Sequence, residues 1–199
     1  NGNMQWAKKY DDGNTSGSIA YDVTVTSDGG YAFTGTNQFA PGTADGMVIK
    51  TDHDGLVQWA KSFESGNSDE SLAIIEDADS LVVTSMQYGQ SATRYDAVIM
   101  KLNRSNGNVI WARNYEIDGK SNLPREIYKT STGYGVNVLN ETQWYLSTPE
   151  EVILNTDRNG IAVSLSKIAS IPYRISYGYV PTGDGGFVTS LVEANNNNA

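Results

Sequence analysis

The side chains that could do chemistry in this chain of 199 residues are carboxylates, hydroxyls and aromatic rings, because there is no cysteine and one histidine. The lack of cysteine removes thiolate nucleophiles, disulfides and zinc–thiolate sites together. A Ser–His–Asp arrangement would have to use His53, which lies in the polar turn "TDHDG" and is expected to be solvated. We therefore predict no catalytic residues.

Neighbouring carboxylates are the one feature that favours an enzyme, because glycoside hydrolases work with a pair of them. The pairs recur with a repeat described below and fall mostly in expected loops, where solubility and turn formation explain them. A polysaccharide hydrolase or lyase that uses loop carboxylates stays as an alternative. The pairs are Asp11 and Asp12, Asp69 and Glu70, Glu116 and Asp118, and Glu150 and Glu151.

A calcium site is suggested by three oxygen-rich turns, "TDHDG", "LNRSNG" and "NTDRNG". Calcium takes six to eight oxygen ligands in proteins, and these turns offer fewer. Asp, Asn and Gly are also the residues that a tight hairpin requires. We favour turn formation and expect no metal or cofactor, with Asp52 and Asp54 as the weak calcium candidates.

Aromatic residues recur at a fixed spacing. "MQWAKKY" (4–10) returns as "VQWAKSF" (57–63) and as "VIWARNY" (109–115). A repeat of about fifty residues predicts one supersecondary unit stacked several times. We expect the repeated tryptophans, Trp6, Trp59 and Trp111, to pack between neighbouring units rather than to bind sugar.

The fold class follows from reading one repeat as strands. "IAYDVTVT" alternates in character, and "YAFTGT", "GMVIKT" and "LVQWAKSF" follow it between turns that contain glycine. Four short strands in meander order are a propeller blade. Segment 69–80 alone resembles a helix, but its place in the repeat predicts a strand. We predict an all-β, β-propeller-type array of four-stranded antiparallel blades, about three full blades plus a split, incomplete fourth.

The predicted domain organisation is one repeat domain over residues 1–193 and an Asn-rich tail or linker over 194–199. Residues 4–10 are expected to lie beside about 186–193, as the outermost strand of the last blade, if the ring closes on itself; otherwise these two edges are expected to pair with another molecule. That blade would still lack its third strand. Either the natural chain continues, or a partner supplies the strand, or a distorted ring closes without it. The repeat copies lie near residues 19–63, 69–115, 123–168 and 173–193.

The motifs W-A-K-x-[FY], D-G-G-Y and V-I-K-T-D-x-D-G resemble the tandem β-propeller repeats of secreted and surface proteins of bacteria and archaea. The match is close over residues 4–63 and weaker beyond, where Asn155 replaces the repeated lysine and Ser164 the tryptophan. The resemblance implies an extracellular or cell-surface protein. It implies no catalytic residues, because that group of proteins shares none.

Binding residues are expected in the longer, variable connections "NQFAPGTAD", "QYGQSATRYD" and "NETQWYLSTPEE". Variable loops on a rigid scaffold are where binding generally resides. Trp144 lies outside every repeat position and is the best single candidate for a contact residue. The full set of candidate ligand-binding residues is Trp144, Tyr145, Phe39, Tyr88 and Tyr95.

The net charge of −9 argues against nucleic acid and anionic membranes as partners, and no apolar run is long enough for a membrane helix. We expect a non-enzymatic extracellular scaffold that presents its loops to a glycan, to a protein or to itself. A structural subunit that polymerises by strand addition at the incomplete blade is an alternative. Three glycosylation sequons, at Asn14, Asn103 and Asn140, are about as many as chance provides.

Overall fold

The computed structural model describes residues 2–4, 6–10, 17–40, 43–65, 68–88, 94–141, 150–170, 174–182 and 187–193. Trp144 and Tyr145, two of the predicted contact residues, lie outside these ranges. Of residues 38–40, 43, 169–170, 174–181 and 187–193 the backbone alone is described.

Within these ranges every regular element is a β-strand, and the strands form antiparallel sheets in chain order. Blade 1 consists of β1 (Ser18–Val25), β2 (Tyr31–Ala40), β3 (Thr43–Thr51) and β4 (Val57–Phe63). Blade 2 consists of β5 (Glu70–Asp77), β6 (Ser80–Tyr88), β7 (Tyr95–Asn103) and β8 (Val109–Tyr115). Blade 3 consists of β9 (Ser121–Lys129), β10 (Gly133–Glu141), β11 (Glu150–Asp157) and β12 (Ala162–Ser170). A two-stranded sheet follows, of β13 (Arg174–Pro181) and β14 (Phe187–Glu193).

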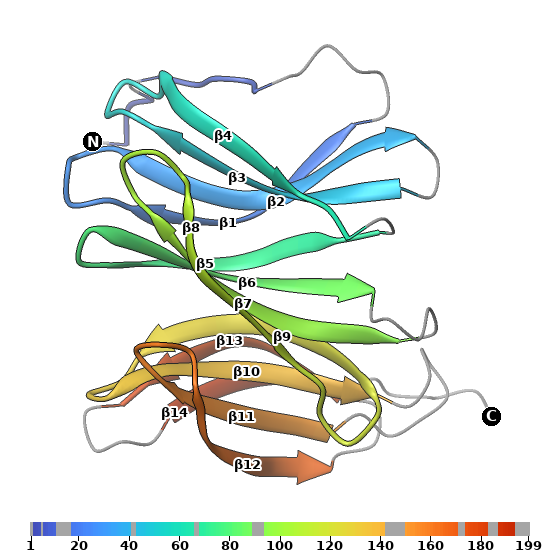
Figure 1. Ribbon diagram of the computed structural model, residues 1–199. Helices are drawn as coiled ribbons and strands as arrows, with labels where there is room; N and C mark the ends of the chain where they lie inside the picture. The colour runs from blue at the N-terminus through green and yellow to red at the C-terminus, as the bar shows by residue number, and fades with distance from the viewer. Residues whose placement is uncertain are drawn as a thin grey trace.

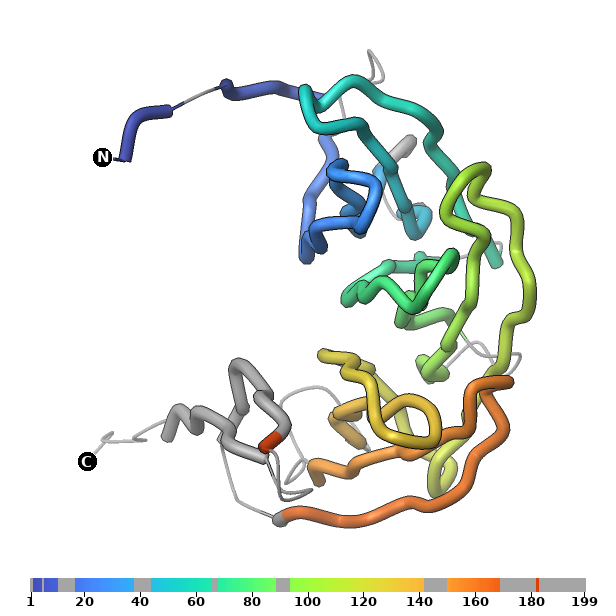
Figure 2. The backbone as a smooth tube through the Cα atoms, turned by 90° about the vertical axis from the view of Figure 1, so that its left-hand side faces the viewer, coloured from blue at the N-terminus to red at the C-terminus, as the bar shows by residue number. Residues whose placement is uncertain are grey.

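The blades are stacked face to face (Figure 1) and follow a curved arc (Figure 2). The first strands β1, β5 and β9 line the inner side of the arc, and the fourth strands β4, β8 and β12 lie on its outer side. One side of the arc is open. The predicted fold class is confirmed: the protein is all-β, with three four-stranded blades.

The segment with helix-like spacing, residues 69–80, is a strand and a turn. Residues Glu70–Asp77 form β5, which pairs with β6 along its whole length. Pairing with β6 gives alternate backbone amides a partner, and the Ile74 amide donates to Asp22 of blade 1. The apolar residues Ala73 and Ile74 pack on opposite blade faces. This sheet context outweighs the local helical spacing of Leu72 and Ile75.

The hydrophobic core lies between the blades rather than within one of them. The interface of blades 1 and 2 buries Val48 of β3 against Ile74 of β5 and Leu81 of β6, with Trp59 packed at its margin. The interface of blades 2 and 3 repeats this arrangement, with Trp111 at the margin. Trp59 and Trp111 are half-buried. Each indole packs at the edge of a blade interface, and the buried strand residues form the centre of that interface.

One element differs from the prediction. Residues 6–10 are not a strand and do not pair with β14, which in the described structure pairs with β13 alone. The segment instead lies against blade 1, where Trp6 meets Tyr31 and Tyr10 meets Phe33. Side-chain packing on the next blade therefore holds this segment without any sheet pairing. The described part of the chain contains no apolar helix of membrane-spanning length.

Candidate functional site

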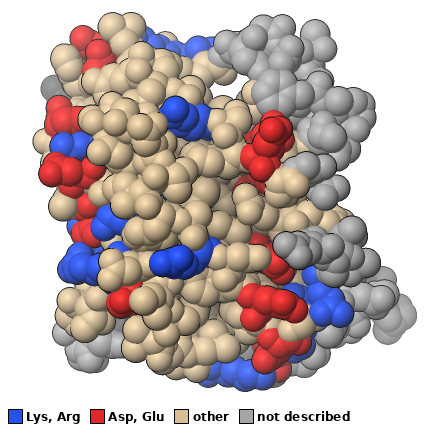
Figure 3. Space-filling view, in the orientation of Figure 1, with Lys and Arg blue, Asp and Glu red and all other residues tan. Residues whose placement is uncertain are grey.

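The two ends of the blades differ in character. At one end, here the turn end, short turns join first to second and third to fourth strands, at the left of Figure 1. At the other, the loop end, the second strands end and the third strands begin. In Figure 3 acidic side chains gather toward the loop end, whereas acidic and basic side chains alternate along the turn end.

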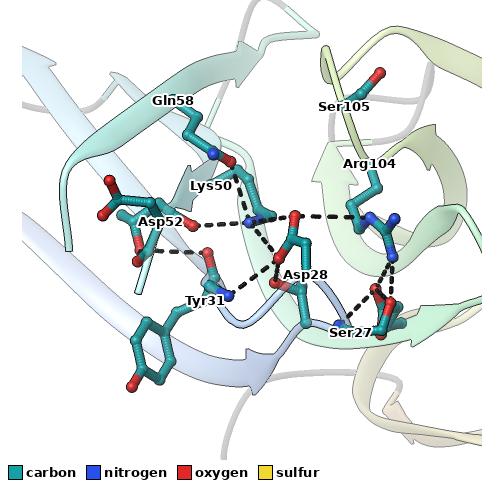
Figure 4. Close-up of polar contacts among 12 residues, drawn as sticks. Ser27, Asp28, Tyr31, Lys50, Asp52, Gln58, Arg104 and Ser105 are labelled. Atoms are coloured by element: carbon teal, nitrogen blue, oxygen red, sulfur yellow. Dashed lines mark hydrogen bonds and ion pairs between the residues drawn. The ribbon is translucent and has the colours of Figure 1, made fainter. Parts of the chain in front are cut away.

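A buried lysine organises the turn end of blade 1. Lys50 is fully buried, and its Nζ lies 3.0 Å from Asp28, 2.7 Å from the carbonyl oxygen of Thr51 and 3.2 Å from Gln58 (Figure 4). Burial would raise the pKa of Asp28, but hydrogen bonds from Thr26 and Gly30 and the Lys50 ammonium lower this pKa to about 2. The lysine of the repeat thus has a structural partner in its own blade.

Arg104 extends this cluster across the blade boundary. Its guanidinium, from the β7–β8 turn, forms an ion pair with Glu76 and donates a hydrogen bond to Ser27 of blade 1 (Figure 4). The Glu76 carboxylate in turn accepts a hydrogen bond from the Ser27 amide at 2.9 Å. The Arg104 carbonyl accepts a hydrogen bond from Trp59 Nε1 at 2.8 Å. One turn therefore fixes blade 2 to blade 1 through both its side chain and its backbone.

Asp77 plays the matching part between blades 2 and 3. Its carboxylate accepts hydrogen bonds from Lys101 at 3.1 Å, from the Tyr134 hydroxyl at 2.8 Å and from Arg158 at 3.1 Å. Burial would raise the pKa of Asp77, but the hydrogen bonds from Tyr134 and Lys101 and the charges of Lys101 and Arg158 lower it to about 2. A carboxylate with this many internal donors is an anchor between blades and is poorly placed to take up a proton from a substrate.

The weak calcium candidates lie in the turn between β3 and β4. Asp52 Oδ1 accepts hydrogen bonds from the amides of Asp54 and Leu56, at 2.9 and 2.8 Å, and the exposed Asp54 side chain lies 3.3 Å from His53. The corresponding turn of blade 3 repeats the pattern at Asp157. An aspartate that accepts its own turn's amides is a turn former. Among the described residues, no three acids or histidines are grouped so that they could hold a metal ion.

At the loop end, the structure brings two of the predicted contact residues together. Tyr88 ends β6, Tyr95 begins β7, and the two are directly paired across the hairpin. Their ring centroids are 4.4 Å apart in an edge-on arrangement. Burial, followed by the neighbouring Tyr88, raises the pKa of Tyr95 to about 12, so its hydroxyl stays protonated at neutral pH. Phe39 lies in β2, where the backbone alone is described.

Acids and a third tyrosine adjoin this pair. Burial and a hydrogen bond to Glu70 raise the pKa of Tyr21, and the charges of Glu70 and Asp69 also act on Tyr95. Asp69 is itself buried and accepts a hydrogen bond from the Ser65 hydroxyl at 2.7 Å. Burial raises the pKa of Asp69, whereas its hydrogen bonds oppose that rise. We call Tyr21, Asp69, Glu70, Tyr88 and Tyr95 the tyrosine–acid patch.

Sequence reasoning missed Tyr21 as a member of this patch. Its place in an alternating strand is typical of a core residue, and it is 41% exposed. The available signal was the acid at position 70, which begins the neighbouring inner strand of the array. Inner strands of adjacent blades converge at the arc's axis, so side chains at their loop ends can meet.

Comparisons with known proteins address the fold. No protein-family model and no curated protein matches the chain. A solved structure does: the quinohemoprotein alcohol dehydrogenase from Comamonas testosteroni aligns with a TM-score of 0.51 at 12% identity. The fold is of the β-propeller type. The alignment covers 83% of this chain and 31% of the dehydrogenase, and at this identity the likeness concerns the fold alone.

Proposed function

We propose that this chain is a β-propeller scaffold that binds a glycan at its loop end, outside the cell or at its surface, without chemistry of its own. The observation that carries the proposal is the contrast between the two ends. The turn-end acids Asp28 and Asp77 are engaged by cations of the fold, while the tyrosine–acid patch lies at the opposite end of the blades, where β6 ends and β7 begins. The location outside the cell rests on the resemblance of the repeat motifs.

The chemistry of the patch favours a sugar. Tyrosine rings present flat apolar surface with a polar tip, and carboxylates accept hydrogen bonds from hydroxyl groups. Tyr88 and Tyr95 are half-buried, so their rings are held in place before a ligand arrives. A protein partner would call for a broad interface with an apolar core, and the patch is small and acidic.

The test is binding of the purified chain to an array of glycans, followed by titration of any ligand found. Replacing Tyr88 or Tyr95 with alanine should reduce affinity at least tenfold, whereas Tyr88→Phe should keep most of it if the ring provides the contact. Leu56, which is 60% exposed at the turn end, supplies the matched control: Leu56→Ala should bind like the wild type. Binding that survives both tyrosine variants contradicts the proposal, and so does the absence of any glycan ligand.

A polysaccharide hydrolase or lyase is the second candidate, because the pKa of one loop-end acid is shifted in the direction that a general acid needs. Burial and the charges of Glu64 and Asp69 raise the pKa of Asp45, as general acid catalysis requires. Glu150 behaves in the opposite way: hydrogen bonds from Lys120 and Lys167 lower its pKa. Release of reducing sugar by the wild type and its loss in Asp45→Asn would establish the enzyme and overturn the scaffold.

A further inference from the structure

Each blade interface holds a cluster of charged side chains at its turn end, and the two clusters differ in net charge. In the cluster between blades 1 and 2 (Figure 4), the cations are Lys50 and Arg104. Their partners are Asp28, Glu76 and the exposed Asp79. Three acids thus surround two cations, and each cation has an acid of its own.

The cluster between blades 2 and 3 has the opposite balance. The Asp77 carboxylate faces three cations: Lys101 Nζ at 3.1 Å, Arg158 Nη1 at 3.1 Å and Lys129 Nζ at 3.8 Å. Among the residues that the structure describes, Asp77 is the sole acid paired with any of the three. Three positive charges against one negative charge leave the cluster at +2, in a chain whose net charge is −9.

The reversal arises at one position of the repeat. Glu76 and Lys129 are the first residues of matching repeat segments, "EDADSLVVTS" and "KTSTGYGVNV". In blade 2 the acid at this position forms an ion pair with Arg104, which comes from the turn between the third and fourth strands. In blade 3 the equivalent turn supplies Arg158, but a lysine stands at the acid's position. The arginine therefore has a second cation beside it in place of an acid.

Two of the three cations reach solvent close together. Lys129 and Arg158 both face Oδ1 of Asp77, so their nitrogens are no further apart than the sum of the two distances. Their side chains are 50% and 52% exposed, whereas Lys101 is 16% exposed and donates a hydrogen bond to the buried Tyr134. Asp77 engages Arg158 through Nη1 alone, and Lys129 lies beyond hydrogen-bond distance from Asp77. The other guanidinium nitrogens and the Lys129 ammonium can therefore donate to a ligand.

We propose that Lys129 and Arg158 form an anion-binding site at the turn end of blades 2 and 3, which takes an oxyanion group such as sulfate or carboxylate. A guanidinium presents paired N–H donors that match the oxygens of such a group, and an ammonium adds charge. A bound anion would also offset the repulsion between the two cations. The site is independent of the tyrosine–acid patch, which lies at the other end of the blades and has the opposite charge.

The direct test is an NMR titration of the isotope-labelled chain with sodium sulfate, at an ionic strength that sodium chloride keeps constant. The amides of residues 129–133 and 157–160 should show shifts that saturate, with a dissociation constant of about 10 mM or below. The balanced cluster serves as an internal control, so the amides of residues 26–29 and 103–106 should show no saturable shift. The absence of saturable shifts at residues 129–133, or equal shifts at both clusters, overturns the proposal.

Charge exchange at the repeat position gives the matched variant. Lys129→Glu reproduces the charge of Glu76 and should fold, because the new carboxylate can pair with Arg158 as Glu76 pairs with Arg104. The affinity for sulfate should fall at least about tenfold, and Arg158→Gln should lower it at least about fivefold. Arg104→Gln, in the balanced cluster, should leave the affinity unchanged. A folded Lys129→Glu variant that binds sulfate like the wild type refutes the site.

A second series of titrations identifies the source of the oxyanion. An oligosaccharide of uronic acids carries the carboxylate group on a polymer, and a neutral oligosaccharide of equal length is its control. The ligand is an acidic glycan if the oligouronate binds at least about tenfold more tightly than sodium acetate and loses that binding in Lys129→Glu. Equal affinity for the two indicates a free anion. Both outcomes support the site, whereas equal shifts from the neutral sugar contradict it.

Discussion

Asp77 is the residue on which the contact between blades 2 and 3 depends electrostatically, because three donors from both blades converge on it. The contacts of Asp77 with Tyr134 and Arg158 of blade 3 could not be predicted from the sequence. Asp77 stands where blade 1 has Ser27, and its partner Tyr134 lies in another blade, 57 residues away. The repeat pattern indicates which positions face a neighbouring blade. A residue pair such as Asp77 and Tyr134, which occurs at one blade interface and is not repeated at the next, cannot be recognised from the repeat.

The lowered pKa of Asp77 predicts how stability depends on pH. A carboxyl whose pKa is about 2 when folded and near 3.8 when unfolded stabilises the fold above pH 4 and loses that contribution as pH falls from 4 to 2. The loss should amount to roughly 2 kcal/mol. Asp77→Asn should flatten this part of the curve, measured as urea unfolding from pH 2 to 7. The raised pKa of Asp69 acts in the opposite direction, so the difference between variant and wild type is the quantity to compare.

Glycine at the blade contact gives a second test at the level of single residues. Gly29 and Gly107 both have positive φ, but a Cβ on Gly29 meets nothing within 4 Å, while one on Gly107 would lie 2.8 Å from Trp59. Gly29→Ala should cost about 1–2 kcal/mol from backbone strain alone. Gly107→Ala should cost about 1–3 kcal/mol more, because the indole must move. Equal losses in urea unfolding would show that the indole yields freely.

Among the elements, the strands were predictable because alternation and glycine turns repeat in register, and that register identified β5 as a strand. Residues 4–10 were not. The residues of the motif W-A-K-x-[FY] pack on a turn of the next blade. In β4 and β8 they also form a strand, because the third strand of the same blade pairs with them. Without that neighbour the packing persists and the strand does not.

Trp6 and Trp59 both lie over the glycine of a β3–β4-type turn, Gly55 and Gly107 respectively. Trp59 belongs to a strand and Trp6 does not, so replacing each by alanine should reduce stability by different amounts. Trp59 is half-buried between blade 1 and blade 2. Trp59→Ala should lower the free energy of unfolding by about 3 kcal/mol. Trp6 is 41% exposed, and Trp6→Ala should cost less than about half as much. A loss below about 1 kcal/mol for Trp59→Ala would contradict its role as a packing residue.

At the scale of the whole molecule, the main contacts between the described blades join neighbours in the array, so stability should be approximately the sum of blade terms and interface terms. Blade 2 is the one four-stranded blade that is covered on both faces by other complete blades. Its amides in β5–β7 should exchange with solvent most slowly. Those of β1 should exchange at least tenfold faster, because Val23 and Val25 of this strand are 61% and 68% exposed. Hydrogen exchange with mass spectrometry decides this, and equal protection of β1 and β5 would contradict the greater stability of blade 2.

The indole over the neighbouring glycine also bears on where such a chain can be cut. A blade begins, in sequence, with its inner strand. The turn of that blade is covered by a tryptophan from the outer strand of the preceding blade, so the packing unit begins one strand earlier. A fragment that begins at β5 would keep the whole sheet of blade 2 but would lose Trp59, whose indole packs on Gly107. Fragments intended for expression or grafting should therefore start at Val57 rather than at Glu70, so that they include β4 and its Trp59 contact with blade 2.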